Sequence, residues 1–105
     1  MTNLNRLEQL LSYYQADPKD AFTIYGLALE YLNSDLVKAR SYFEILLQEH
    51  PNYLPTYYHV GHLYEDLEEE ELAIAAYKKG IKLAEAEKKT MTLRELKNAL
   101  AELEF

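Results

Sequence analysis

The stretch that decides the fold lies in the second half of the chain and reads Tyr57-x-x-Val60-Gly61-x-x-Tyr64, then Ala73-x-x-x-Tyr77 and Gly80. Bulky and small residues recur here at intervals of three and four, which places them on one face of an α-helix. Small residues such as Gly61 and Ala73 within a bulky face let two helix axes approach closely. The stretch therefore predicts helical segments that pack closely against each other.

An earlier copy of this pattern precedes it in the chain. The copy reads Ile24-x-x-Leu27-Ala28-x-x-Tyr31, then Ala39-x-x-x-Phe43. Its first half lies 33 residues before the counterpart and its second half lies 34 residues before it. Pro18 and Pro51 are also 33 residues apart. Because proline cannot continue a helix interior, each marks the end of the preceding helix.

Apolar residues at helical spacing predict six helices in all. The first stripe is Leu4, Leu7, Leu10, Leu11 and Tyr14, and the last is Leu93, Leu96, Leu100 and Leu103. With only three glycines, three prolines and few β-branched residues, the chain is expected to be all-α. Asp35 and Asn52 are predicted N-caps, and Thr92-Leu93-Arg94-Glu95 has the capping-box form that predicts the start of the last helix.

A repeat of about 34 residues with this pattern resembles the tetratricopeptide repeat (TPR). The resemblance covers roughly residues 3–87. It implies one domain over residues 1–105, with a leading half-repeat helix at 3–17, repeats at 20–52 and 53–87, and a capping helix at 91–104. The implied fold is a right-handed α-α superhelix of about six antiparallel helices. The second repeat lacks its terminal proline, since Ala84-Glu85 stands there, so its second helix is expected to reach about Lys89.

Composition narrows the classes of function. Eleven basic and eighteen acidic residues give a net charge of −7, so a nucleic-acid partner is not expected. The absence of cysteine excludes disulfides and cysteine-based zinc sites. No signal peptide or membrane span is apparent, so we expect a cytoplasmic protein without a membrane partner. No phosphate-binding loop, dinucleotide fingerprint or nucleophile elbow occurs, so neither catalysis nor a cofactor is expected.

The resemblance also implies where a partner would bind, because many relatives hold peptides on the concave side lined by the first helix of each pair. The residues there that the packing pattern leaves unused are Phe22, Tyr25, Leu29, Asn33, Tyr58, His59, His62, Glu65 and Asp66. Tyr25, Leu29 and His59 stand where some relatives carry the basic and amide groups that grip a peptide carboxylate, so that clamp is absent. An aromatic lining suits an apolar or mixed peptide, or an amphipathic helix.

Other interpretations of these residues stay open. Tyr25, Leu29 and Tyr58 could instead pack against neighbouring helices or the capping helix, or the exposed apolar faces could meet in a self-assembled homodimer. His59 and His62, with Glu65 and Asp66 beside them, could approach a zinc ligand set, but such sets on one helix are usually adventitious, so no metal site is expected. The acidic residues at 65–71 are expected to form a solvated turn that favours the start of the next helix, or else a patch that steers a basic partner.

Overall fold

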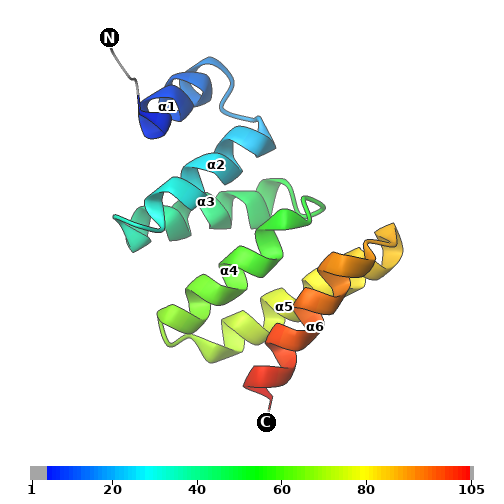
Figure 1. Cartoon of the computed structure of the whole chain (residues 1–105). Coiled ribbons are helices and arrows are strands. Elements are labelled where there is room, and N and C mark those ends of the chain that lie inside the picture. Colours follow the sequence, from blue (N-terminus) through cyan, green and yellow to red (C-terminus); the bar gives the residue numbers. More distant parts are fainter. Residues whose placement is uncertain (1–4, 105) are drawn as a thin grey trace. The chain divides into compact units, whose positions relative to one another are not determined.

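The computed structural model describes residues 5–104, which form six α-helices and no strand (Figure 1). The helices are α1 (Arg6–Ala16), α2 (Ala21–Tyr31), α3 (Leu36–Glu49), α4 (Pro55–Asp66), α5 (Glu70–Glu87) and α6 (Thr90–Leu103). The all-α prediction is confirmed. Leu4 and the predicted start of the leading helix at residue 3 lie outside the described residues.

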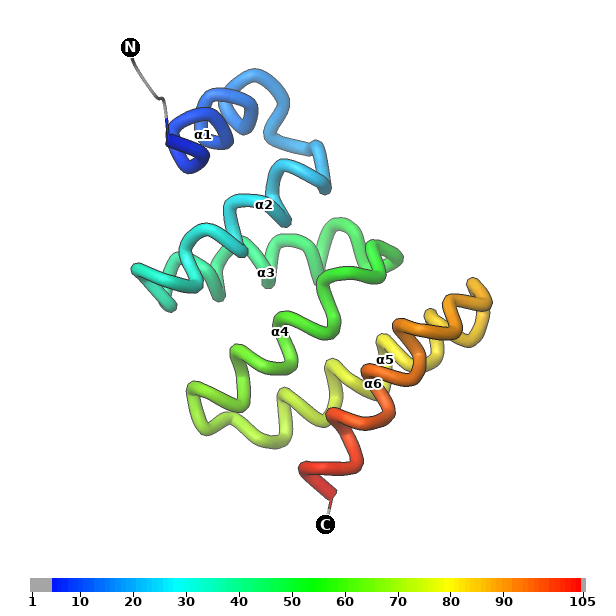
Figure 2. Tube along the Cα trace, viewed as in Figure 1, coloured from blue at the N-terminus to red at the C-terminus, as the bar shows by residue number. Residues whose placement is uncertain are grey.

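The helices fall into two compact units, and Figure 2 follows the chain through each. The N-terminal unit, up to Tyr53, holds α1, α2 and α3, and the C-terminal unit, from Leu54, holds α4, α5 and α6. In both units the two helices of the repeated pattern pack side by side. The sequence repeat therefore corresponds to one helix pair in each unit.

The N-terminal unit is built on the α2–α3 pair, with α1 packed against α2. Ile24, Leu27 and Ala28 of α2 are fully buried, as are Ala39 and Phe43 of α3. These are the residues that the repeat pattern placed on the packing faces. The α1 helix docks through Leu10, whose side chain lies over Gly26 of α2.

The C-terminal unit packs α5 between α4 and α6, with many contacts in the α4–α5 and α5–α6 pairs. Gly80 of α5 is the point at which the three helices meet. A Cβ atom at this position would lie 2.6 Å from the Cβ atom of Tyr57 and 3.0 Å from Cδ1 of Leu96. Both Tyr57 and Leu96 are buried, so α6 is held directly on α5 where glycine leaves room for it.

Side chains cap the N-termini of all three helices of the N-terminal unit. Asn5 closes a capping box with Glu8 at α1, and Asp20 accepts a hydrogen bond from the Thr23 N–H at α2. Asp35 caps α3 as predicted, accepting from the Lys38 N–H. The prediction for Asn52 is wrong, because α4 begins at Pro55 after Leu54, without any side-chain cap. Pro55 has its φ preset for the first helical position, where a backbone N–H has no partner within the helix.

The last two helices differ from the sequence expectation at the turn that joins them. Helix α5 ends at Glu87 rather than near Lys89, because Lys88 adopts a left-handed conformation with φ 59°. The Lys89 N–H then bonds back to the Ala84 carbonyl and closes the helix. Helix α6 therefore begins at Thr90, not at Thr92, which lies within its first turn. Among the residues the structure describes, no helix is long and apolar enough to cross a bilayer.

Candidate functional site

Four of the predicted groove residues lie together on α4. The ring of Tyr58 meets the ring of His62 edge to face, with centroids 4.5 Å apart, and meets that of His59 at 5.5 Å. His62 Nδ1 lies 3.5 Å from Glu65 Oε2. Tyr58, His62 and Glu65 are each only partly buried, so this helix face presents aromatic and polar atoms together. We call Tyr58, His59, His62 and Glu65, with Tyr77 beneath them, the α4 cluster.

The α4 cluster is anchored by Tyr77 of α5. This side chain is fully buried, and its hydroxyl donates a hydrogen bond to Glu65 Oε2. Burial, the hydrogen bond to Glu65 and the nearby carboxylate charge all raise the pKa of the Tyr77 phenol, so the hydroxyl stays a donor. The His62 ring also contacts the Tyr77 ring, with centroids 5.7 Å apart. Glu65 is therefore held from inside the protein and in turn holds His62.

Gly61 makes room for this arrangement. A Cβ atom at Gly61 would lie 2.2 Å from Cε1 and 2.6 Å from Cζ of Tyr77, closer than any atom contact permits. The ring therefore lies directly on the backbone of α4, and its hydroxyl reaches Glu65 one turn further along the helix. The small residue that the sequence pattern assigned to helix packing thus also positions the polar residues of the α4 cluster.

His59 lies at the inner edge of the α4 cluster. Burial is the main cause that lowers its pKa, and the neighbouring His62 lowers it further. Glu95 of α6 acts in the opposite direction. The imidazole of His59 therefore favours its neutral form.

Helix α6 supplies residues that the sequence analysis missed. A pocket of about 170 Å³ lies between α4 and α6 and is lined by Tyr58, His62, Glu95, Asn98, Ala99 and Glu102. The apolar face of α6 predicted a capping helix and no site residues. The signal for a second face was present, because Glu95, Asn98 and Glu102 are spaced three and four residues apart along the helix. We call this space the α4–α6 pocket.

The predicted residues of the N-terminal unit form no comparable polar group. Phe22 is 61% exposed, Leu29 is half-buried and Asn33 is exposed in the turn after α2. Tyr25 packs edge to face against Tyr53, with centroids 5.6 Å apart, and burial raises its pKa. Tyr25 thus has the packing contact that the sequence analysis considered as an alternative to ligand binding.

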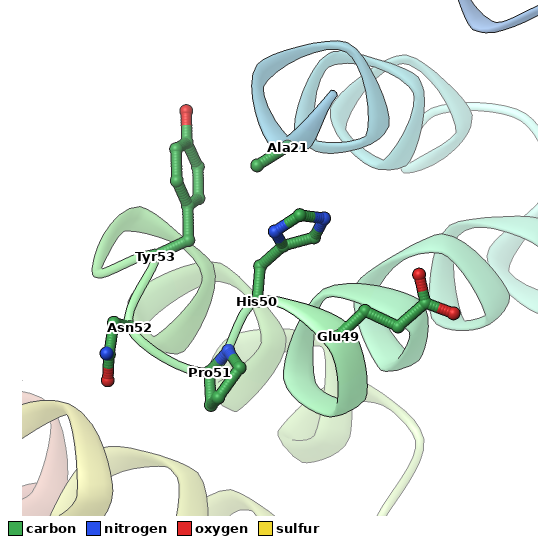
Figure 3. A pocket seen from close by; sticks show the side chains of 6 residues that line it. All are labelled: Ala21, Glu49, His50, Pro51, Asn52 and Tyr53. Carbon is green, nitrogen blue, oxygen red and sulfur yellow. The ribbon is translucent and has the colours of Figure 1, made fainter. Parts of the chain in front are cut away.

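A second pocket, of about 350 Å³, lies at the end of α3 (Figure 3). Figure 3 shows the His50 ring turned toward Ala21, with Tyr53 beside it, while Asn52 points away. His50 Nε2 is buried and has no hydrogen-bond partner. The nearby Asp20 carboxylate is already engaged, since the N–H and the hydroxyl of Thr23 both donate to its Oδ2, at 3.0 and 2.6 Å. These hydrogen bonds lower the pKa of Asp20.

Asp66 and the acidic run lie at the end of α4. Asp66 is its last residue and is exposed, apart from the α4 cluster. Glu68 takes a left-handed conformation in the turn, and Glu70 and Glu71 occupy the first turn of α5, where the helix dipole favours negative charge. Within residues 5–104, no three histidine, aspartate or glutamate side chains are grouped closely enough to hold a metal ion.

Comparisons with known proteins agree with this geometry. A family model described as tetratricopeptide repeat matches residues 54–87, which include α4 and α5. The crystal structure of a tetratricopeptide repeat domain protein from Salinibacter ruber is similar, with 42% sequence identity and a TM-score of 0.77 over 81% of this chain and 96% of that one. A solution NMR structure of a tetratricopeptide repeat domain protein from Salinibacter ruber gives 43% identity and a TM-score of 0.78, covering 84% of this chain and 90% of that one. No curated protein sequence matches the chain.

Proposed function

This chain belongs to the tetratricopeptide repeat family, and we propose that it is a non-catalytic interaction module that binds a peptide or helix of a protein partner on the face formed by α4 and α6. Repeats of this family generally mediate protein–protein interactions, and the family is typically non-catalytic. What is specific to the proposal is the surface used, which comprises the α4 cluster and the α4–α6 pocket. Phe22, Tyr25 and Leu29 of α2, and Asn33 in the turn after α2, stay predicted partner contacts.

One observation supports the proposal, namely that the partly exposed Tyr58 and His62 contact each other and are flanked by Glu65 and Tyr77. His62 is placed by Glu65 and by the Tyr77 ring, and Tyr58 packs edge to face on His62. A surface whose side chains are already ordered loses less conformational entropy when a partner binds. Tyrosines in such surfaces are frequent hot spots, because they bury a large area and keep a polar end.

Affinity capture with the full chain as bait tests the proposal. Proteins retained from the source lysate by the wild-type chain are identified by mass spectrometry and then compared with those retained by a Tyr58→Ala, His62→Ala double variant. We expect the variant to bind such a partner about 30-fold more weakly or worse, as expected when a hot spot is lost. Tyr13→Ala is the matched control, because Tyr13 is an exposed tyrosine on α1.

Two results would contradict this surface assignment. Equal retention of the partner by the double variant and the wild type would place binding elsewhere. Light scattering of the wild-type chain that shows a concentration-dependent dimer, abolished by Tyr13→Ala and not by the double variant, would favour the self-assembled homodimer instead.

A further inference from the structure

The α4–α6 pocket joins groups from two helices that share one electrostatic preference. Tyr58 and His62 form its α4 wall, and Glu95, Asn98 and Glu102 form its α6 wall. The two carboxylates and the amide oxygen of Asn98 accept hydrogen bonds, and the tyrosine ring has a negative face. When the His62 proton lies on Nδ1, on the side of Glu65, the Nε2 atom is an acceptor as well. Both helices therefore contribute groups to this pocket that can attract a cation.

Neither carboxylate of the pocket is neutralised within the protein. Among the residues the structure describes, no lysine or arginine forms an ion pair with Glu95 or Glu102, and the Lys78 ammonium pairs with Glu104 instead. Glu102 contributes to the raised pKa of Tyr77, and Glu95 opposes the lowered pKa of His59. Both glutamates line the pocket together with Tyr58 and His62 of α4.

The size of the pocket limits its occupant to one side chain. Its volume of about 170 Å³ equals roughly six water molecules in the liquid. Ala99 also lines the pocket and is 6% exposed, and its short side chain takes up little of the space there. A planar guanidinium has five donors in a fixed fork and stacks on aromatic faces, which matches two carboxylates beside a tyrosine better than a compact ammonium does.

We propose that the α4–α6 pocket binds an arginine side chain of the protein partner, between the carboxylates of Glu95 and Glu102 and against the ring of Tyr58. The inference rests on the proposed function, because it names the chemistry by which that same surface recognises its partner. The chain has a net charge of −7, which favours the approach of a basic partner. The charge of this site is opposite to that of the carboxylate clamp, which this sequence lacks.

The test uses arginine itself as the probe, so it needs no knowledge of the partner. Nα-acetyl-arginine N-methylamide is titrated into the full-length ¹⁵N-labelled chain, and the citrulline analogue, which has the same shape without the charge, is titrated in parallel. We expect saturable amide shifts centred on Tyr58, His62, Glu95, Asn98 and Glu102 with arginine, weaker shifts with the lysine analogue, and none with citrulline. Added salt should weaken the arginine shifts, because screening reduces attraction between exposed charges.

A matched pair of variants separates the pocket from general acidity. Glu95→Gln, Glu102→Gln should weaken arginine binding about tenfold or more, whereas Glu85→Gln, Glu87→Gln removes the same charge from exposed positions of α5 and should leave it unchanged. Equal effects of the two double variants, or shifts spread over residues 68–71, would overturn the inference. If arginine fails to bind while Tyr58→Ala, His62→Ala still releases the captured partner, the cation pocket is wrong and the binding surface stands. If arginine binds the pocket while the double variant still retains the partner, the partner binds elsewhere, and both the proposed surface and the assignment of this arginine to the partner are wrong.

Discussion

The helix pairs α2–α3 and α4–α5 share one packing pattern but differ in polarity. Counted by the repeat, Phe43 corresponds to Tyr77, Leu32 to Glu65 and Leu29 to His62. Phe43 and Tyr77 are both fully buried. Of these two residues, only Tyr77 carries a hydroxyl. Only the α4–α5 pair has a carboxylate, that of Glu65, at the position that accepts its hydrogen bond. The comparison shows how one hydroxyl and one carboxylate can create a polar surface on a helix pair whose packing is otherwise the same.

The largest effect is expected when the buried aromatic ring of either helix pair is removed. Tyr77→Ala should lower the free energy of unfolding by about 3–5 kcal/mol, because it leaves a cavity at the centre of the unit. Urea denaturation monitored by circular dichroism measures the loss, and amide hydrogen exchange locates it.

Phe43→Ala is the matched change in the N-terminal unit, with a loss of similar size. We expect Tyr77→Ala to reduce protection in α4, α5 and α6, and Phe43→Ala to reduce it in α2 and α3. Loss of protection across all six helices in both variants would mean that the two units unfold as one, and the comparison between them would then have no energetic basis.

Effects of intermediate size on stability are expected at two glycines, one in each unit. Gly61→Ala places a methyl group inside the Tyr77 ring and should cost about 2 kcal/mol net, since overpacking outweighs the gain of about 1 kcal/mol in helix propensity. At Gly26 the nearest atom is the flexible Cδ2 end of Leu10, 2.9 Å from the added Cβ. Gly26→Ala should therefore change the free energy of unfolding by less than about 1 kcal/mol.

The same denaturation experiment measures both glycine variants. If Gly26→Ala were as damaging as Gly61→Ala, the close approach of Tyr77 to α4 would not be the distinguishing feature of the C-terminal unit.

A smaller effect on stability is expected when Tyr77 is replaced by phenylalanine, the residue type at the corresponding position of the α2–α3 pair. Tyr77→Phe removes the hydrogen bond to Glu65 and keeps the ring, so the free energy of unfolding should fall by only about 1 kcal/mol. Glu65 and His62 should become more mobile, which NMR side-chain relaxation can measure. Unchanged mobility of His62 would show that the hydroxyl of Tyr77 does not order the α4 cluster.

The smallest expected effect is a pH dependence of the free energy of unfolding, caused by a histidine of α4 that has no counterpart in α2. His59 corresponds to Gly26, and its pKa in the folded protein is lowered below the ordinary value of 6.5. The unfolded chain therefore binds the proton more readily, so stability is full above the unfolded pKa and falls as the pH drops below it. Between about pH 7.5 and about pH 5.5, His59→Gln should lose less stability than the wild type does. Identical pH profiles for the two chains would contradict this assignment.

Much of the fold was predictable from local pattern. The repeated positions of large and small residues predicted the helix pairs, and Asp17-Pro18 and His50-Pro51 marked two of the ends, because a proline excludes a helix interior regardless of its surroundings. Asp35 was recognised as a cap for the same local reason. The start of α6 was misplaced, since it depends on Lys88 taking a left-handed conformation that its residue type does not favour.

The sequence by itself determined the helix pairs, because their spacing and small residues are local properties of the chain. It also placed Tyr58, His62 and Glu65 on one helical face, since that follows from 3.6 residues per turn. Only the tertiary structure decided what lies opposite that face. The hydroxyl of Tyr77 reaches Glu65 from α5, and Gly80 lets Leu96 hold α6 so that Glu95 and Glu102 face Tyr58. Contacts between residues twelve to forty-four positions apart depend on packing, which periodicity within one helix cannot specify.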